Sequence, residues 1–413
     1  MRHDKQVFSK RRARLTEQSP DDLFLAFGDG GDDLDPNYAY LSGSRETAGV
    51  LLFGHRRFNL PRTRGAPGPD YMRSRHASAV LLLPKSDPVL AQWGEDASET
   101  VEGVDAAALG VDLVADVAGL DAILATALRG GRTLWLIRSA PASFRDRPDA
   151  LTRLAGRIRD HFPAVRIRDA GERLDRMRAL KDDGEIEAIE NALQVTRRGL
   201  DRIAAATAPG IREGQLEAEL SYAYRTAGAS HAFGAICAAG SNALQLHYRA
   251  NDGVLSEGQL LLIDTGVRLE GYCSDISRTF PVSGKFTVRQ KELYDVVLEA
   301  QRVAIEGCVV GVTLADLHAL AYEVIDRAGL GSRFAHGIGH HLGIHVHDTP
   351  QADGPLEAGA VITIEPGVYL EDEGIGIRIE DDVLVTVDGP RVLSADFPRS
   401  TDEIERWMAG GKD

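Results

Sequence analysis

Hydrophobic positions in the first 170 residues come in short runs separated by amphipathic stretches. Apolar runs of four or five residues are typical of buried strands. They occupy residues 23–27, 50–53, 80–83 and 134–137, while 113–128 and 150–158 carry apolar residues at helical spacing. Strands that alternate with helices predict an α/β layer domain for this part of the chain.

A long helix is predicted to open the second part of the chain. Asp182 can cap its N-terminus, and Glu185 takes the capping-box position three residues later. Apolar residues then recur at helical spacing until Pro209, which would end the helix. We therefore expect two domains, one over residues 1–172 and one over residues 173–413.

Acidic residues occur in pairs within two predicted hairpins. Asp264 ends an apolar strand, and a turn near residues 269–271 would place Asp275 opposite it. Glu365 and Glu380 are related in the same way about residues 372–373. Opposed side chains share a face, with Cβ atoms about 5 Å apart, and a divalent cation would remove their repulsion. The alternative for the first pair is two solvent-facing turn acids; otherwise the pairs predict a four-carboxylate site for two divalent ions.

Histidines cluster in the segment AHGIGHHLGIHVHD, residues 335–348. The cluster consists of His336, His340, His341, His345 and His347. The i, i+4 spacing of its first two members resembles a zinc-binding helix, but the glycines between the histidines disfavour a helix. A glycine-rich strand and turn that lines a metal pocket is the better interpretation. His341 and His345 are expected to be outward-facing or structural.

The ordered set Asp264, Asp275, His340, Glu365 and Glu380 resembles the ligand set of the two-metal "pita-bread" metallopeptidases. The blocks HGIGHHLGIHVHD, TIEPGVY and GIGIRIEDD are similar to the Xaa-Pro peptidase branch, which contains aminopeptidase P and prolidase. This resemblance implies an α/β N-terminal domain like that of creatinase, followed by an α+β pita-bread catalytic domain. It also implies that Asp264 chelates one metal, Asp275 and Glu380 bridge both, and His340 and Glu365 complete the second.

The resemblance implies roles for further side chains. His247 and His347 would contact the scissile carbonyl or the oxyanion, and Glu365 would carry a proton toward the leaving nitrogen. Arg378 would pair with an active-site carboxylate. The same resemblance places Tyr369 in the Arg378 network, His336 in the substrate pocket, and Phe233 where the family often has a tyrosine.

The implied reaction is hydrolysis of an Xaa-Pro bond at a peptide N-terminus or in a dipeptide, by a hydroxide that bridges two metal ions. One histidine among carboxylates favours Mn²⁺, with Zn²⁺ or Co²⁺ as alternatives. Dipeptidase and aminopeptidase activity both fit. The rival hypotheses are a catalytically silent pita-bread binding protein and a metal-free amidinohydrolase of the creatinase type, both of which should lack the full ligand set.

Composition limits the classes of molecule that this protein is expected to bind. The 413 residues contain 47 Lys and Arg against 62 Asp and Glu, a formal charge of −15, which disfavours nucleic acid as a partner. Three cysteines, no signal peptide and no apolar run of 18 residues favour a cytoplasmic protein without a membrane partner. The substrates would be small proline-containing peptides.

Two further expectations concern the N-terminal domain. The resemblance implies a homodimer or homotetramer, in which Trp93 would reach a neighbouring subunit's site; a core position for Trp93 is the alternative. The arginine-rich segment 54–77 is interpreted as a mobile loop between two strands, with a docking loop for an acidic partner as the alternative.

Overall fold

The structure is a computed structural model, and it describes residues 6–29, 34–61, 76–93, 97, 99–137, 149–349 and 354–410. The chain divides into two compact units, Arg2–Asp175 and Arg176–Asp413. The division falls three residues after the predicted boundary, within helix α6 (Gly171–Ala179). Among the described residues, no helix is both long enough and apolar enough to cross a membrane.

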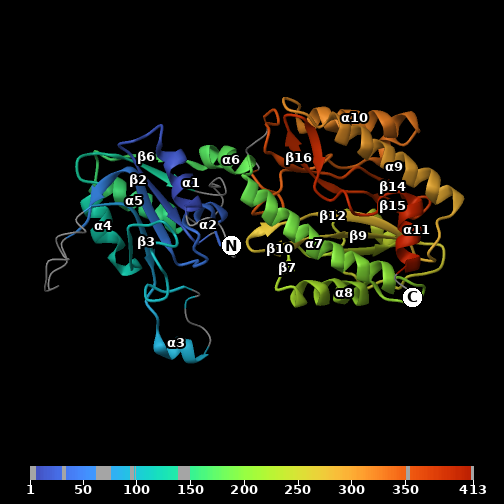
Figure 1. The fold of residues 1–413 in the computed structure, drawn as a ribbon, viewed down its shortest axis with the longest axis horizontal. Helices are drawn as coiled ribbons and strands as arrows, with labels where there is room; N and C mark the ends of the chain where they lie inside the picture. The colour runs from blue at the N-terminus through green and yellow to red at the C-terminus, as the bar shows by residue number, and fades with distance from the viewer. Residues whose placement is uncertain are drawn as a thin grey trace. The chain divides into compact units, whose positions relative to one another are not determined.

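The N-terminal unit, coloured blue to green in Figure 1, is built on a six-stranded mixed sheet in the order β4-β3-β2-β1-β5-β6. Its strands are β1 (Leu23–Phe27), β2 (Val50–Asn59), β3 (His76–Leu83), β4 (Leu113–Asp116), β5 (Thr133–Ile137) and β6 (Arg166–Asp169). Its other elements are α1 (Val7–Thr16), α2 (Pro36–Ser42), α3 (Pro88–Trp93), η2 (Val117–Gly119), α4 (Leu120–Ala127) and α5 (Ala150–His161). Alternate strand residues such as Leu23, Leu25 and Leu52 pack against α4 and α5. The predicted α/β layer is thus confirmed.

Two predictions for this unit need correction. Residues 113–116 form strand β4 rather than the start of a helix, because Asp116 accepts a hydrogen bond from the Ala118 amide and the helical segment begins only after this cap. The arginine-rich segment is not all loop, since residues 54–59 continue β2 and residues 76–77 begin β3. Residues 62–75 of that segment lie outside the described residues.

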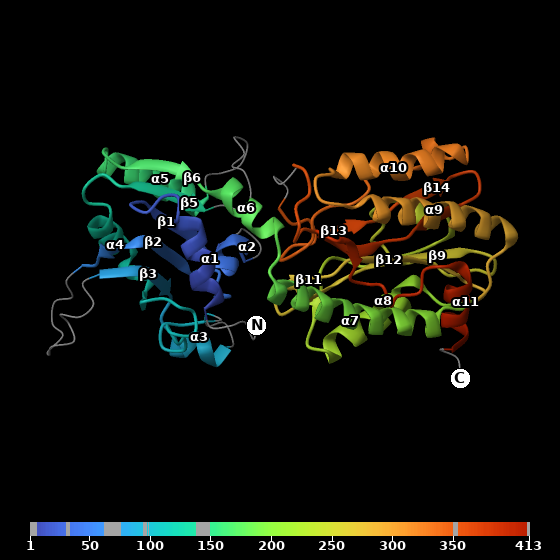
Figure 2. The same ribbon diagram turned by 45° about the horizontal axis from the view of Figure 1, so that its top comes forward.

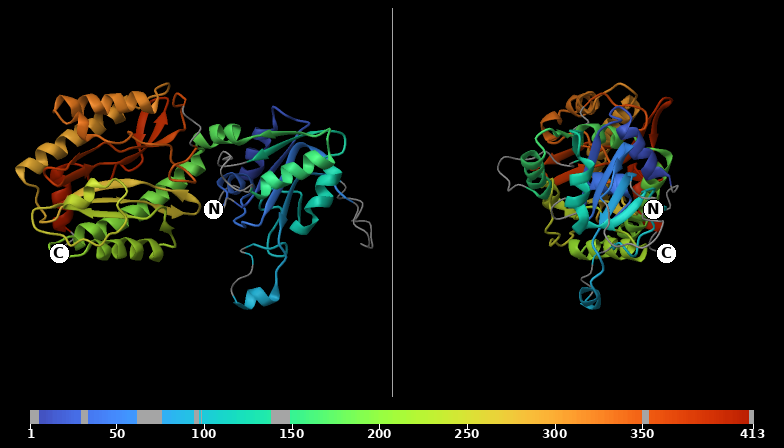
Figure 3. Two further views of the ribbon diagram at one scale, coloured as in Figure 1. Left: turned by 180° about the vertical axis from the view of Figure 1, so that it is seen from behind. Right: turned by 90° about the vertical axis from the view of Figure 1, so that its left-hand side faces the viewer.

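The C-terminal unit places its strands between two pairs of packed helices, α7 with α8 and α9 with α10 (Figures 1 and 2). The view from behind gives the same arrangement (Figure 3). The helical elements are α7 (Asp183–Ala206), α8 (Glu213–Thr226), η3 (Gly240–Leu244), α9 (Val288–Gly307), α10 (Leu314–Arg327), η4 (Gly331–Arg333) and α11 (Thr401–Gly410). The predicted capping box of α7 is confirmed, because Asp182 and Glu185 exchange both side-chain-to-backbone hydrogen bonds.

Among the described residues of this unit, the strands form four small sheets, β11-β10-β7, β12-β9-β8, β13-β16-β17 and β14-β15. They are β7 (Ser230–His231), β8 (Ile236–Ala239), β9 (Leu260–Thr265), β10 (Val267–Leu269), β11 (Tyr272–Cys273), β12 (Ile276–Pro281), β13 (Val361–Ile364), β14 (Gly367–Leu370), β15 (Ile375–Arg378), β16 (Asp381–Thr386) and β17 (Gly389–Val392). One continuous apolar core joins the strands to the helices on both sides.

The register of the first hairpin differs from the prediction. Glu270 and Gly271 both have positive φ, 51° and 96°, and form the two-residue turn that pairs Leu269 with Tyr272. This turn is centred one residue later than expected, so Asp264 pairs with Ser277 instead of Asp275. Asp275 lies two positions before Ser277, which makes it a diagonal neighbour of Asp264 rather than its directly opposed partner.

The register of the second hairpin agrees with the prediction. Gly367 pairs with Arg378 in β14 and β15, and Ile364 pairs with Asp381 in β13 and β16. Both pairs are symmetric about residues 372–373, so Glu365 and Glu380 occupy equivalent positions between the two ladders. The sequence symmetry of this acid pair is therefore confirmed.

Candidate metal centre and active-site cavity

The five candidate metal ligands line one cavity of about 520 Å³ in the C-terminal unit. Asp264 comes from β9, Asp275 from the connection between β11 and β12, His340 from the histidine segment, Glu365 from the connection between β13 and β14, and Glu380 from that between β15 and β16. Ligand atoms of Asp275, His340 and Glu380 all lie within 4.8 Å of one another.

His340 is held with one ring nitrogen facing the acids. Its backbone N–H donates to Thr363 Oγ1 at 3.1 Å, and its Nδ1 lies 3.1 Å from the carbonyl oxygen of His341. Because a carbonyl only accepts, Nδ1 carries the proton. Nε2 is left with its lone pair, 3.5 Å from Asp275 Oδ2 and 3.7 Å from Glu365 Oε1. Burial and the nearby His347 lower the pKa of His340 to about 4, so the ring is neutral at pH 7.

The glycine before this histidine has a steric reason. A Cβ on Gly339 would lie 2.0 Å from the carbonyl oxygen of Thr363, far inside van der Waals contact. Only glycine allows the histidine segment to approach β13 closely enough for two hydrogen bonds: the Thr363 N–H donates to the His340 carbonyl oxygen, and the His340 N–H donates to Thr363 Oγ1. The histidine segment contains no helix among its described residues, as its glycine content predicts.

The carboxylates form a site that is suited to cations. Burial, followed by repulsion from neighbouring carboxylates, raises the pKa of Asp275 and of Glu380 well above the ordinary range. Burial also raises the pKa of Glu365 to about 7. Asp264 Oδ1 and Asp275 Oδ1 are buried without a hydrogen-bond partner among the described residues. Unpaired carboxylate oxygens beside a neutral imidazole are hard and borderline donors, so these residues fit divalent metal ions.

A directed hydrogen-bond network connects Asp264 to His336. Arg378 Nη2 donates to Asp264 Oδ2 at 2.6 Å, and its Nη1 donates to the Tyr369 hydroxyl oxygen at 2.8 Å. The Tyr369 hydroxyl lies 2.9 Å from His336 Nε2, while His336 Nδ1 lies 2.8 Å from the Gly337 carbonyl. The carbonyl requires a proton on Nδ1, and burial lowers the pKa of His336 to about 4. The neutral ring therefore accepts from Tyr369 through Nε2.

The network also includes a residue that the sequence analysis missed. Ser277 accepts a hydrogen bond from Arg378 Nε at 3.0 Å and donates to Glu380 Oε2 at 2.8 Å. Its position opposite Asp264 in the β9–β12 ladder is the signal that could have found it, once the turn is placed at Glu270 and Gly271. Thr363, which holds the His340 backbone, also escaped notice because it lies within an apolar strand.

The remaining predicted site residues also line the cavity: Phe233, His247, His336, His347 and Arg378. His347 lies edge-on to His340, with ring centroids 4.3 Å apart. Tyr369 is not part of the cavity wall but contacts it through Arg378 and His336. His341 is buried, in agreement with a structural role, whereas His345 lines the cavity.

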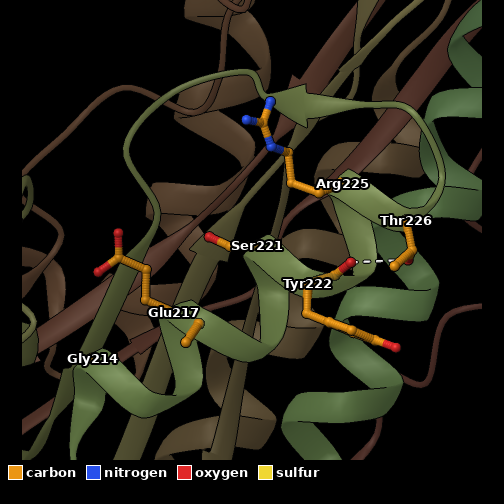
Figure 4. A pocket seen from close by; sticks show the side chains of 7 residues that line it. Gly214, Glu217, Ser221, Tyr222, Arg225 and Thr226 are labelled. Carbon is orange, nitrogen blue, oxygen red and sulfur yellow. Dashed lines mark hydrogen bonds between the residues drawn. The ribbon is translucent and has the colours of Figure 1, made fainter.

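Two further features are not among the residues that line this cavity. Trp93 is 76% exposed at the end of α3, so the core position considered for it is wrong. A shallow pocket on α8, lined by Glu217, Ser221, Tyr222 and Arg225 among others, contains none of the candidate metal ligands (Figure 4). The chemistry therefore concentrates in the cavity between the two hairpins.

Comparison with known proteins identifies the family of this chain. Residues 187–387 match the model of metallopeptidase family M24. Xaa-Pro aminopeptidase 1 of Streptomyces coelicolor is 33% identical over 412 residues, which cover 91% of this chain and 79% of the relative. The chain belongs to metallopeptidase family M24. Within that family it lies in the Xaa-Pro peptidase branch, as the sequence motifs predicted.

Solved structures extend the likeness to both domains. Pseudomonas aeruginosa aminopeptidase PepP superposes with a TM-score of 0.84 at 29% identity, covering 100% of this chain and 99% of that one. Escherichia coli aminopeptidase P with the inhibitor Pro-Leu superposes with a TM-score of 0.82 at 26% identity, covering all of both chains. The M24 protein thus combines an N-terminal α/β domain with a C-terminal pita-bread domain, as expected.

Proposed function

We propose that this M24 protein is a metal-dependent exopeptidase that hydrolyses the bond before proline at the N-terminus of peptides. The observation that carries the proposal is the convergence of four carboxylates and His340 in one cavity, in a chain that resembles Xaa-Pro aminopeptidases over nine-tenths of its length. A silent binding protein or a metal-free amidinohydrolase has less support, because neither needs the complete ligand set that is present here.

We assign two divalent metal ions to the site, with Mn²⁺ favoured and Zn²⁺ or Co²⁺ as alternatives. Asp264, Asp275, His340, Glu365 and Glu380 would hold them. When bound, such ions lower the pKa of coordinated water and polarise a carbonyl. The lone pair of His340 Nε2 and the unpaired oxygens of the two aspartates support this assignment.

The other side chains of the cavity have roles that follow from their positions. His247 and His347, which line the cavity, would donate hydrogen bonds to the carbonyl oxygen as it gains negative charge. Burial lowers the pKa of His347, so it acts at neutral pH as a neutral donor. Glu365 would accept a proton and pass it to the leaving imino nitrogen. Arg378 fixes the orientation of Asp264 through its short ion pair.

Aminopeptidase action on peptides of three or more residues is favoured over strict dipeptidase action, because the relatives that match nearly the whole chain carry the name aminopeptidase. A cytoplasmic location and assembly into two or four copies complete the proposal. The buried free thiols of the three cysteines agree with a reducing compartment, and the exposed Trp93 offers a surface for a second copy. Light scattering of the wild type and of Trp93→Ala tests the assembly.

Hydrolysis of Ala-Pro and Ala-Pro-Ala by the Mn²⁺-loaded protein tests the reaction. We expect the tripeptide to be cleaved between Ala and Pro, and Asp275→Asn to lose activity by several orders of magnitude. The matched control is Asp372→Asn, an exposed acid in the turn of the second hairpin that lies outside the cavity. If neither peptide is cut with Mn²⁺, Zn²⁺ or Co²⁺, or if Asp275→Asn matches the wild type, the proposal is wrong.

A further inference from the structure

Two arginines line the active-site cavity and form no ion pair with any residue that the structure describes. Arg249 follows the candidate catalytic His247 by two residues, and Arg268 lies on β10. Arg378 lines the same cavity but is neutralised by Asp264. In a chain with a formal charge of −15, carboxylate partners are plentiful. Two cavity arginines without one are therefore available to an anionic ligand.

Arg268 is fixed in place by the histidine segment. Its Nη1 donates to the Ile344 carbonyl oxygen at 2.6 Å, directly before the cavity-lining residues His345 and Val346. A guanidinium carries five N–H donors, so this contact leaves most of them unused. Arg268 is half-buried, which limits its freedom and lowers the entropy lost when a ligand binds.

Arg249 approaches the cavity from another segment. It is exposed, and a methyl group placed on Gly234 would lie 3.9 Å from its Nη1. Gly234 and its neighbour Phe233 line the cavity as well. Arg249 and Arg268 thus belong to separate parts of the chain that contribute positive charge to the same cavity.

The cavity contains carboxylates that would hold metal ions and two arginines that would not. The carboxylates that would hold divalent cations have their negative charge cancelled when the cations bind, whereas the charges of Arg249 and Arg268 remain. A guanidinium matches the planar geometry of a carboxylate, with two parallel N–H···O bonds. A short peptide carries such a group at its C-terminus.

We propose that Arg249 and Arg268 bind a carboxylate of the substrate, so that the cavity prefers short Xaa-Pro peptides with a free C-terminus, or peptides with an acidic side chain in the equivalent place. This inference rests on the proposed peptidase function and adds a substrate class to it. The arginines act on substrate binding, so the preference should appear in KM more than in kcat.

The test compares kcat/KM for Ala-Pro-Ala with that for Ala-Pro-Ala-amide. Charge-assisted hydrogen bonds of ordinary strength predict roughly a tenfold advantage for the free acid. A second comparison, Ala-Pro-Asp-amide against Ala-Pro-Asn-amide, distinguishes an acidic side chain from the C-terminus. In Arg249→Gln and Arg268→Gln the advantage should fall severalfold, and in the double variant it should vanish. Arg225→Gln, on α8 outside the cavity, is the matched control and should keep it (Figure 4).

Further readouts separate substrate binding from a purely structural role of Arg268. Loss of the Ile344 contact alone would lower activity on acid and amide peptides by the same factor and would leave their ratio intact, which would overturn the proposal. Arg268→Lys, which keeps the charge, should retain part of the ratio. Raising the ionic strength should reduce the wild-type ratio, because an exposed guanidinium is screened.

Measurements of ligand binding test the carboxylate preference without relying on catalytic activity. Calorimetric titration with Pro-Leu and with Pro-Leu-amide should give tighter binding of the free acid to the wild type and equal binding to the double variant. If both substrates are cleaved equally well by the wild type and both ligands bind equally, the carboxylate preference is wrong while the peptidase function stands. If no Xaa-Pro peptide is cleaved, the peptidase function is wrong, and equal binding of the two ligands would also reject the arginine site.

Discussion

Substitution of Glu365 by glutamine measures the cost of keeping its charge in the metal-free cavity. Burial raises the pKa of Glu365 from 4.5 to about 7. At pH 8 this shift lowers the free energy of unfolding by roughly 3 kcal/mol. At pH values between 4.5 and about 7, Glu365 holds its proton more often in the folded state than in the unfolded state. The free energy of unfolding therefore falls as pH rises through this window, and the loss is complete above pH 7. Glutamine keeps the size of the side chain and removes the charge.

We expect the metal-free Glu365→Gln variant to unfold at a higher temperature than the metal-free wild type at pH 8. For a unit of this size, roughly 3 kcal/mol corresponds to a rise in Tm of roughly 6 to 12 °C. At pH 5 the difference should shrink to about 1 kcal/mol or less, since the wild-type carboxyl is then mostly protonated in the folded state. Adding Mn²⁺ should stabilise the wild type more than the variant, because the variant lacks one ligand.

Scanning calorimetry of chelator-treated protein at both pH values makes the measurement. The control is Glu371→Gln, in the exposed turn of the same hairpin, which should change the free energy of unfolding by less than about 0.5 kcal/mol. Two results would refute the reasoning: a variant no more stable than the wild type at pH 8, or a gain of the same size at pH 5 and pH 8. The first would mean that the cavity solvates the Glu365 charge without a cation.

Three further substitutions test the scaffold of the cavity. Tyr369→Phe leaves Arg378 Nη1 without its acceptor and should lower the free energy of unfolding by roughly 1–3 kcal/mol in urea titrations. Gly367→Ala places a Cβ 2.8 Å from the Tyr369 hydroxyl, so kcat should fall at least severalfold while Gly354→Ala, with open space around it, leaves kcat unchanged. Arg278→Met removes the nearer arginine partner of the fully buried Asp381, which keeps only Arg399 at 3.7 Å, and should cost roughly 3–5 kcal/mol in calorimetry.

The sequence predicted the acid pairs because hairpins are symmetric about their turns. For Glu365 and Glu380 the symmetry was enough, because the strand pairs of both ladders are centred on the same two residues, 372 and 373. For Asp264 and Asp275 it failed by one residue at the turn. Two consecutive residues with positive φ close the turn at Glu270 and Gly271, and glutamate is an unusual residue for that conformation. The positive φ of Glu270 was therefore not visible from its residue type.

Other parts of the site depend on contacts between distant segments. Thr363 meets His340 across 23 residues, and Ser277 meets Glu380 across 103, so neither contact has a local signal. In the N-terminal unit, residues 113–116 have helical spacing but lie at the sheet edge, where pairing with β3 outweighs local propensity. The roles of these residues become visible only when the fold brings the segments together.

Two arginines near this cavity differ in how strongly their loss should affect folding and metal binding. Arg278 is fully buried behind the acids, where its Nη1 donates to the backbone carbonyl of Glu380 and its Nη2 to the carboxylate of Asp381. Its loss would damage folding and metal geometry together, because the same side chain holds the strand and the acid. Arg378 lines the cavity itself, where it neutralises Asp264 and donates a hydrogen bond to Tyr369. A cation beside Asp264 compensates its charge in the same way, so loss of Arg378 should cost the metal-loaded protein less stability than the metal-free protein, and a comparison of the two states separates the structural contribution of Arg378 from its catalytic one.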